Sequence, residues 1–375
     1  MKITIESPFE TRSGYGARSR DIIKSILNQY KDSELNLISL PWGNTSFIDV
    51  PELKQYKVQT VDNNSDIYIH VGIPNETKPK GKFNILVTAG IETDLVSREW
   101  ISGCNNMDLI IVPSQHSKNV FENSFYPMYE LQKPIEVLFE GVDTNIYKKT
   151  NELEEKVNNL QFDSKFNFLF IGTWLPGDFA HDRKDVGMLI KWFSEAFNNQ
   201  KQVGLILKLN IGALNEINKE ILIDRIKKIK GKSNAPIYLL YGDYTDEQMN
   251  SLYNREDIKS FISFTHGEGW GRDGIQFLTS EKKVILPNFS GHLDYCTESN
   301  SILLEGQLEQ VHNSALYPPL IIQDSKWFRV NYDKVGQKIL SFINSENKTC
   351  EFDNKFSLDN MKIELKSIID RYICK

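Results

Sequence analysis

Four glycines lie close together in the stretch HGEGWGRDG. A glycine allows backbone conformations that are closed to other residues, and it lets a ligand come close to the main chain. The stretch follows a buried strand that we predict over Ser260 to His266, and apolar residues recur at helical spacing from Ile275 onward. The first turn of a helix offers unpaired N–H groups to an anion. This strand–loop–helix order therefore predicts a phosphate-binding turn, whose glycines are Gly267, Gly269, Gly271 and Gly274.

A carboxylate stands in the middle of this glycine-rich turn, at Glu268. A carboxylate repels a phosphate, but it accepts hydrogen bonds from hydroxyl groups. A phosphate site beside a hydroxyl-binding carboxylate indicates a nucleotide sugar as the ligand. The alternative is that Glu268 lies in an ordinary glycine-rich connection of another kind of α/β protein, since such turns serve many ligands.

The segment GEGWGRDGIQFLTSEKKVILPNFSGHLDY resembles the donor-binding segment of a known family. This is the retaining glycosyltransferase family of GT-B fold called family 4, or glycosyltransferase group 1. Its run of Glu, Gly, aromatic residue and Gly matches Glu268, Gly269, Trp270 and Gly271, whereas its second Glu is replaced here by Gln276. The resemblance implies that Glu268 touches the donor sugar, that Gln276 binds the ribose, and that the neighbouring residues Gly267, Gly269, Trp270, Gly271 and Arg272 bind the donor.

A second loop with basic residues, GTWLPGDFAHDRKDVG, follows a strand predicted over Phe166 to Gly172. Loops of this length at the end of a strand are usually functional. Its residues Arg183 and Lys184 resemble the basic pair that the family places on the donor diphosphate, where they offset the charge of the leaving group. Many relatives also carry an Arg directly after the strand's glycine, where this chain has Thr173, and Arg272 could substitute for it. The alternative is that Arg183 and Lys184 form an ordinary surface pair.

The first strand and the first helix are joined by a smaller glycine-containing loop, Ser13 to Gly16. In a doubly wound domain this position binds a phosphate or a substrate group. We expect Gly16 to bind the donor, and Tyr15, Arg18 and Glu92 to bind the acceptor. Alternatively, the loop is a plain turn followed by two solvated arginines, and Glu92 belongs to a helix cap.

Strand-like and helix-like runs alternate along the whole chain, which argues for parallel sheets covered on both faces. We predict an α/β protein of GT-B fold with two doubly wound, Rossmann-like domains that face a central cleft. Residues 1–150 form the N-terminal acceptor domain and residues 165–350 the C-terminal nucleotide-sugar donor domain. The polar run 148–165 is the expected linker. A final helix at about 356–375 is expected to pack back on the first domain, as the family resemblance implies.

The composition is that of a globular protein. The 375 residues include 40% hydrophobic and 25% charged residues, with a net charge of −6, which argues weakly against broad nucleic-acid binding. No apolar run is long enough to span a bilayer, and the start does not read as a signal peptide, so we expect a cytoplasmic protein. The cysteines lack metal-ligand spacing and are expected to be reduced thiols: Cys104, Cys296, Cys350 and Cys374.

These observations favour a glycosyltransferase that moves a hexosyl or pentosyl group from a UDP- or GDP-linked donor to an acceptor hydroxyl with retention of configuration. The expected catalytic residues are Glu268, Arg183 and Lys184. No Asp-x-Asp sequence occurs, so we expect metal-independent activity without a cofactor. The acceptor could be a glycan, a lipid, a small molecule, or a hydroxymethylated DNA base of the kind that some phage enzymes modify. The alternative from another class is an inactive nucleotide-sugar-binding protein.

Overall fold

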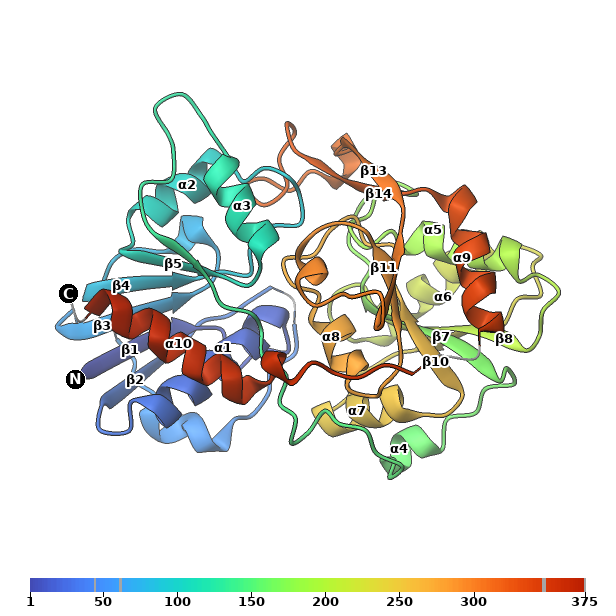
Figure 1. Ribbon diagram of the computed structural model, residues 1–375, viewed down its shortest axis with the longest axis horizontal. Helices are drawn as coiled ribbons and strands as arrows, with labels where there is room; N and C mark the ends of the chain where they lie inside the picture. Colours follow the sequence, from blue (N-terminus) through green and yellow to red (C-terminus); the bar gives the residue numbers. More distant parts are fainter. Residues whose placement is uncertain (44, 61–62, 346–348, 374–375) are drawn as a thin grey trace. The chain divides into compact units, whose positions relative to one another are not determined.

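Parallel β-sheets organise both parts of the chain (Figure 1). The computed structural model describes residues 1–43, 45–60, 63–345 and 349–373. The chain divides into a first unit, which comprises Met1–Gly141, Tyr317–Ser325 and Asn354–Lys375, and a second unit, which comprises Val142–Leu316 and Lys326–Asp353. The first segment of this unit thus ends at Gly141, whereas the sequence analysis places the domain boundary at 150, and the unit also includes the short segment Tyr317–Ser325.

Within its described residues, the first unit contains a six-stranded sheet in the order β2-β1-β3-β4-β5-β6, with every neighbouring pair parallel. Its strands are β1 Lys2–Ser7, β2 Glu34–Ser39, β3 Ser65–Val71, β4 Gly81–Val87, β5 Leu109–Val112 and β6 Ile135–Val137. Its helices are α1 Gly14–Gln29, α2 Arg98–Asn105, α3 Gln115–Asn123 and α10 Leu358–Ile373, with short 3-10 turns η1 Pro51–Tyr56, η2 Pro74–Glu76 and η5 Asn354–Phe356.

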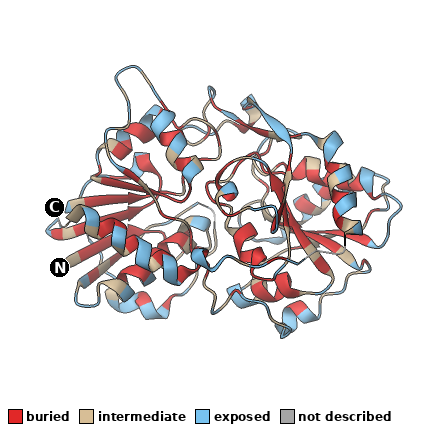
Figure 2. Ribbon diagram, viewed as in Figure 1, coloured by how far each residue is buried: buried red, intermediate tan, exposed pale blue. Residues whose placement is uncertain are grey.

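Most residues of the strands in this sheet are buried, as the red colour of the strands in Figure 2 shows. On β4, Ile85 and Val87 belong to one hydrophobic cluster and Leu86 to another, because successive residues of a strand point to opposite faces. The first cluster includes residues of α1 and α10, and the second includes residues of α2 and α3. Helices therefore cover both faces, which is the doubly wound arrangement predicted from the alternation of elements.

The second unit repeats this architecture with the strand order β12-β11-β10-β7-β8-β9, again with parallel neighbours among the described residues. Its strands are β7 Phe166–Thr173, β8 Val203–Asn210, β9 Ile237–Leu240, β10 Ile258–Ile262, β11 Val284–Pro287 and β12 Ser301–Leu304. Its helices are α4 Glu155–Asn158, α5 Val186–Ala196, α6 Glu216–Lys230, α7 Asp246–Asn254, α8 Arg272–Leu278 and α9 Tyr332–Asn344, with 3-10 turns η3 Gly291–Asp294 and η4 Asn313–Ala315. An antiparallel pair, β13 Gly306–Gln310 and β14 Lys326–Val330, completes it.

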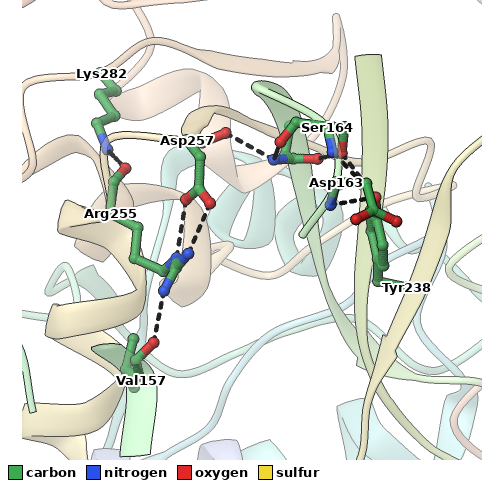
Figure 3. A network of polar contacts seen from close by, with 8 residues as sticks. Val157, Asp163, Ser164, Tyr238, Arg255, Asp257 and Lys282 are labelled. Atoms are coloured by element: carbon green, nitrogen blue, oxygen red, sulfur yellow. Dashed lines mark hydrogen bonds and ion pairs between the residues drawn. The ribbon is translucent and has the colours of Figure 1, made fainter. Parts of the chain in front are cut away.

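Strand β10, which leads into the glycine-rich turn, is held at its start by a polar network (Figure 3). Arg255 pairs with the carboxylate of Asp257 through two nitrogens at 2.9 and 2.7 Å, and it also donates to the carbonyl of Val157 at 2.6 Å. Lys282 donates to the carbonyl of Arg255 at 2.7 Å. A bidentate pair of this kind fixes orientation as well as distance. The network therefore ties the end of α7 and the start of β10 to α4.

The polar run 148–165, expected as a linker, is bound to the second unit. The backbone N–H groups of Lys148 and Thr150 donate to side-chain oxygens of Asn250 and Asn254, both at 3.1 Å. These asparagines lie on α7 and are buried. The start of the run is therefore held against α7 through side-chain amides of that helix.

Of the cysteines, Cys104, Cys296 and Cys350 are free thiols, as expected, and Cys374 lies outside the described residues. Among the helices that the structure describes, none combines the length and the apolar character that a membrane span requires.

Candidate active site

The glycine-rich turn joins β10 to α8 in the second unit. The strand ends at Ile262 and not at His266 as predicted, because the N–H of His266 donates to the carbonyl of Arg183 at 2.9 Å. Gly271 has φ of 84° at the N-terminal end of α8, a left-handed conformation that favours glycine. The predicted order of strand, loop and helix is therefore present, with a shorter strand and a short helix.

Tyr295 accounts for two of the glycines. Its hydroxyl donates to the carbonyl of Gly271 at 2.8 Å. A Cβ atom added to Gly271 would lie 2.9 Å from this hydroxyl, and one added to Gly274 would lie 2.6 Å from it. These two glycines are therefore required by packing within the protein. Gly267 and Gly269 are buried in the same turn, and their expected contact with a donor stays a prediction.

Glu268 forms ion pairs with both members of the basic pair. Lys184 donates to one carboxylate oxygen through a short contact, and Arg183 lies 3.7 Å from the other. All three side chains are largely buried, with 12% to 17% of each exposed. The structure thus brings together the three residues that the sequence analysis names as catalytic, although their roles remain predictions.

The backbone of Glu268 is also fixed, since its N–H donates to Ser290 Oγ at 2.9 Å and its carbonyl accepts from Gly291 N at 2.9 Å. Burial alone would raise the pKa of the Glu268 carboxyl. The charges of Lys184 and Arg183 outweigh it and lower this pKa to about 2. Glu268 is therefore an anion at neutral pH, available to accept hydrogen bonds once its cations are shared with a ligand.

A pocket opens beside this cluster in the second unit. Its polar and charged lining is supplied by Lys184, Glu268, Arg272, Asp273, His292 and Tyr295. Arg272, the predicted substitute for the family's missing Arg, is thus on the same pocket as Lys184. Burial, the largest influence, raises the pKa of Asp273 although Lys184 and Arg272 oppose it.

His292 is a neutral member of the pocket wall. It is completely buried, and its Nε2 lies 2.6 Å from the carbonyl of Pro287, so Nε2 carries the proton that it donates. Burial lowers the pKa of His292. Its Nδ1 has no hydrogen-bond partner among the described residues. The neutral ring can therefore accept a hydrogen bond from a ligand hydroxyl.

The basic pair is carried by a turn just before α5. Asp185 N donates to Asp182 O at 2.8 Å, which closes a turn with Arg183 and Lys184 at its centre. A side-chain oxygen of Asp182 also accepts from the N–H of Val186, the first residue of α5, at 3.2 Å. The carbonyl of Arg183 accepts from the hydroxyl of Thr265 at 3.3 Å as well as from His266. The backbone of Arg183 is therefore anchored by hydrogen bonds to Thr265 and His266, just before the glycine-rich turn.

Two predicted donor-binding residues are more buried than expected. Gln276 lies on α8 with 6% of its surface exposed and is not among the residues that line the pocket. Trp270 is 3% exposed and packs edge-on against Tyr295 at a ring separation of 5.3 Å. The indole therefore supports the turn from inside.

In the first unit, Tyr15 lies at the carboxyl end of the sheet. Its hydroxyl lies 2.9 Å from Thr88 Oγ1 and accepts from the N–H of Ala89 at 3.1 Å. Its ring packs against Trp42 at a centroid distance of 4.5 Å. Glu92 is partly exposed and close enough to act on the Tyr15 hydroxyl, whose pKa is raised mainly by burial. Tyr15 and Glu92 are therefore near one another, and their acceptor role stays a prediction.

Gly16 and Arg18 have internal roles in the first unit. A Cβ atom at Gly16 would lie 2.1 Å from the carbonyl of Thr11, so this glycine is required by its own loop. Arg18 is 1% exposed, and its guanidinium donates to the carbonyls of Leu138 and Phe139 at 2.6 and 2.8 Å. The expectation that Arg18 binds an acceptor is corrected: it satisfies buried backbone carbonyls, and the alternative of a solvated arginine is wrong as well.

Sequence analysis missed Asp273 and Tyr295 and left His292 undecided. Tyr295 carries no motif, and its role depends on a fold that brings η3 against α8. Asp273 lies inside the glycine-rich run and in the first turn of a helix. This position was the sequence feature that could have identified it as a site residue. As for metals, the described residues contain no group of three or more His, Cys, Asp or Glu side chains placed to hold an ion.

Comparison with known proteins supports the fold through matches to solved structures, and not through sequence matches. No protein-family model matches the chain, and no curated protein matches it either. Among solved structures, the Anabaena protein HepE in complex with UDP and glucose is 15% identical, with a TM-score of 0.63, and the match covers 99% of this chain and 100% of HepE.

Two further structures match at similar scores. A glycosyltransferase from Rickettsia africae is 16% identical, with a TM-score of 0.65, over 100% of this chain and 98% of its own. Sucrose-phosphate synthase from Thermosynechococcus elongatus is 10% identical, with a TM-score of 0.65, over 100% of this chain and 99% of its own. These neighbours are GT-B glycosyltransferases, and the chain has the GT-B fold, as predicted.

Proposed function

We propose that the protein is a glycosyltransferase that moves a sugar from a nucleotide-sugar donor to an acceptor hydroxyl with retention of configuration. One observation carries the proposal: an anionic Glu268 pairs with both Lys184 and Arg183, and Glu268 and Lys184 line a pocket in the second unit of a GT-B fold. A nucleotide sugar needs two kinds of binding group. Cations bind its diphosphate, and a carboxylate accepts hydrogen bonds from its sugar hydroxyls. Complexes of HepE with UDP and with UDP-glucose favour a uridine diphosphate sugar as donor.

In this proposal, the basic side chains take the charge of the leaving diphosphate. Lys184 and Arg272 line the pocket and contact the phosphates there, and Arg183, which pairs with Glu268 beside the pocket, adds a third positive charge. Fixed charges that face a developing negative charge stabilise a transition state without reorganisation cost. The carbon–oxygen bond to the diphosphate breaks, an oxocarbenium-like sugar forms, and the acceptor attacks from the same face. The departing phosphate oxygen accepts the acceptor's proton, so no protein nucleophile is required.

Glu268 and His292 orient the sugar. The carboxylate accepts hydrogen bonds from sugar hydroxyls, and Nδ1 of His292, without a partner among the described residues, accepts one more. Correct orientation of bound reactants contributes several kilocalories per mole to catalysis. Glu268 is paired with Lys184 and Arg183 before the donor binds, so the diphosphate must share these two cations with the Glu268 carboxylate.

The acceptor contacts are assigned to Tyr15 and Glu92 in the first unit. A carboxylate and an aromatic residue suit a glycan or another polyhydroxylated small molecule as acceptor. The group that the donor transfers to it is a hexosyl or pentosyl group. A hydroxymethylated DNA base is the second acceptor class, which the net charge of −6 does not favour. We propose that neither a metal nor a cofactor takes part.

The test is a binding screen followed by a turnover assay. Isothermal titration of UDP, GDP and ADP in EDTA identifies the base, and release of free nucleotide from the matching nucleotide sugars reports activity. NMR of the product's anomeric proton gives its configuration. We expect UDP to bind and turnover to persist in EDTA. Binding without turnover of any sugar, with or without acceptors, would mean an inactive binding protein, and no binding of any nucleoside diphosphate would refute the donor site.

A further inference from the structure

The turn that carries Arg183 and Lys184 is held on its N-terminal side by a residue from a distant part of the sequence. Arg329 on β14 donates from one guanidinium nitrogen to the carbonyl of Ala180 at 2.9 Å and reaches Nδ1 of His181 at 3.1 Å. Its Nε lies 2.5 Å from a carboxylate oxygen of Glu309 on β13. Glu309 thus balances the charge of Arg329 and orients its fork toward the turn.

The other end of the turn is held by Tyr332, the first residue of α9. Its hydroxyl donates to the carboxylate of Asp185 through a short contact. Asp185 has φ of 50°, a left-handed conformation that is uncommon for non-glycine residues, although Asp adopts it more readily than most. It is completely buried, and burial raises the pKa of its carboxyl.

Arg329 and Tyr332 are also close to each other. A guanidinium nitrogen of Arg329 lies 3.4 Å from the Tyr332 hydroxyl, and the Tyr332 ring packs on Phe264 at a centroid distance of 5.8 Å. One continuous set of contacts therefore runs from Ala180, through Arg329 and Tyr332, to Asp185. It brackets the two basic residues without touching the pocket, since neither Arg329 nor Tyr332 lines it.

We propose that Arg329 and Tyr332 are positioning residues that hold Arg183 and Lys184 in the geometry that binds a diphosphate. The inference rests on the proposed function, because it assigns the diphosphate to this pair. Its physical basis is the left-handed Asp185. If the Asp185 carboxylate loses its hydrogen bond from Tyr332, or if the carbonyl of Ala180 loses its hydrogen bond from Arg329, the turn can relax. Arg183 and Lys184 then move away from a common phosphate. Small displacements of such groups weaken binding strongly.

The test uses inorganic pyrophosphate as a probe, because it needs only the diphosphate contacts and no choice of base. Calorimetric affinities are compared for the intact chain and for Arg329→Met, Arg329→Lys, Tyr332→Phe and Lys184→Ala, at a temperature at which melting curves show each variant folded. Lys334→Met is the matched control, because Lys334 lies on α9 beside Tyr332 but pairs with the exposed Glu305. Tyr332→Phe removes one hydroxyl and keeps the ring on Phe264, so it should fold.

We expect Lys184→Ala and Arg329→Met to weaken pyrophosphate binding about tenfold or more, and Tyr332→Phe about threefold, as for groups that orient a binding residue. Arg329→Lys should recover part of the loss, and Lys334→Met should bind within about twofold of the intact chain. Normal binding by folded Arg329→Met and Tyr332→Phe, with Lys184→Ala impaired, would overturn the positioning role and leave the proposed function intact. If Lys184→Ala binds pyrophosphate as well as the intact chain does, or if the intact chain does not bind it, both the positioning role and the proposed function are overturned.

Discussion

At the scale of single residues, the site is an ion-pair cluster whose members compete with the expected ligand. Glu268 neutralises Lys184 and Arg183 in the structure, and the donor diphosphate needs the same cations. A buried cation left without its partner attracts any anion that reaches it. Removing the carboxylate should therefore separate binding of the diphosphate from transfer of the sugar.

Glu268→Ala should lower the rate of sugar transfer by about a hundredfold or more, the scale of one oriented contact in a reacting site. The same change should strengthen pyrophosphate binding, because Lys184 and Arg183 lose their competing carboxylate. Steady-state rates and calorimetry measure the two effects. Glu195→Ala, which removes a carboxylate from the exposed pair with Lys191, is the control and should change neither. Normal turnover by folded Glu268→Ala would remove this residue from the mechanism.

The ion pairs of Glu268 should also make stability depend on pH. Because Lys184 and Arg183 lower its pKa from 4.5 to about 2, the unfolded chain binds this proton more readily than the folded one. The stabilisation is fully present above pH 4.5 and is lost as pH falls toward 2. The difference in unfolding free energy between the intact chain and Glu268→Gln should shrink across this window. A difference that stays constant with pH would contradict the lowered pKa.

Gln276 is one of two positions, with Thr173, at which the chain departs from the family it resembles. Hydrogen bonds to charged groups contribute about 1.5–3 kcal/mol, against about 0.5–1.5 for neutral ones. If the ribose lies where the family resemblance implies, Gln276→Glu should strengthen UDP binding. The change should lower the melting temperature in either case, because the side chain is buried. Calorimetry and melting curves of both proteins test this. Unchanged UDP affinity with a lower melting temperature would place this side chain in the core and away from the ribose.

At the scale of secondary-structure elements, glycines decide how loops enter helices. Helix α1 is capped by Ser13, whose side chain accepts from the N–H of Gly16 at 2.9 Å. The close approach of Gly16 to Thr11 makes this loop compact, whereas an added Cβ at Gly14 meets nothing within 4 Å. The two glycines of one loop are therefore under different constraints.

Gly16→Ala should destabilise the protein by about 1–3 kcal/mol, the cost of forcing an extra methyl group into a packed site. Gly14→Ala should be neutral or stabilising by less than about 1 kcal/mol, because it has room and lies in a helix. Urea denaturation of both variants measures the difference. Equal effects would mean that the loop before α1 relaxes freely and that Gly16 is not needed for it.

At the scale of the whole molecule, the last helix completes the first unit. Met361, Leu365 and Ile368 of α10 are buried in the same cluster as residues of β1 and α1. The Met361 sulfur lies 3.1 Å from a nitrogen of Arg18 and 3.3 Å from the backbone N–H of Gly141. The first unit is therefore assembled from both ends of the chain.

Met361→Ala should cost about 2–5 kcal/mol, as for other truncations of large buried side chains. Ile363→Ala on the same helix is the control, since Ile363 is 61% exposed, and its effect should stay within about 0.5 kcal/mol. Hydrogen exchange should place the lost protection in α1, β1 and α10. A loss confined to α10 would mean that the helix is dispensable for the first unit.

The sequence alone determined the class of fold and the position of the main turn. The period of apolar residues predicts the alternating strands and helices, and the cluster of glycines around Glu268 predicts a tight turn. Such signals are carried by neighbouring residues, so they can be recognised without knowing how the chain packs. The long loop before α5 was recognised in the same way, whereas the diphosphate role of Arg183 and Lys184 in that loop came from the family resemblance.

Tertiary structure decided which of these groups meet and which are buried. Lys184 and Glu268 are 84 residues apart in sequence and form an ion pair, while Arg18, only a few residues beyond the first loop, is enclosed among backbone carbonyls. Trp270 supports the turn from within because Tyr295 comes from another element to pack on it. Burial and ion pairing depend on contacts between segments that are distant in sequence. The periodicity of residues within one segment does not predict these contacts.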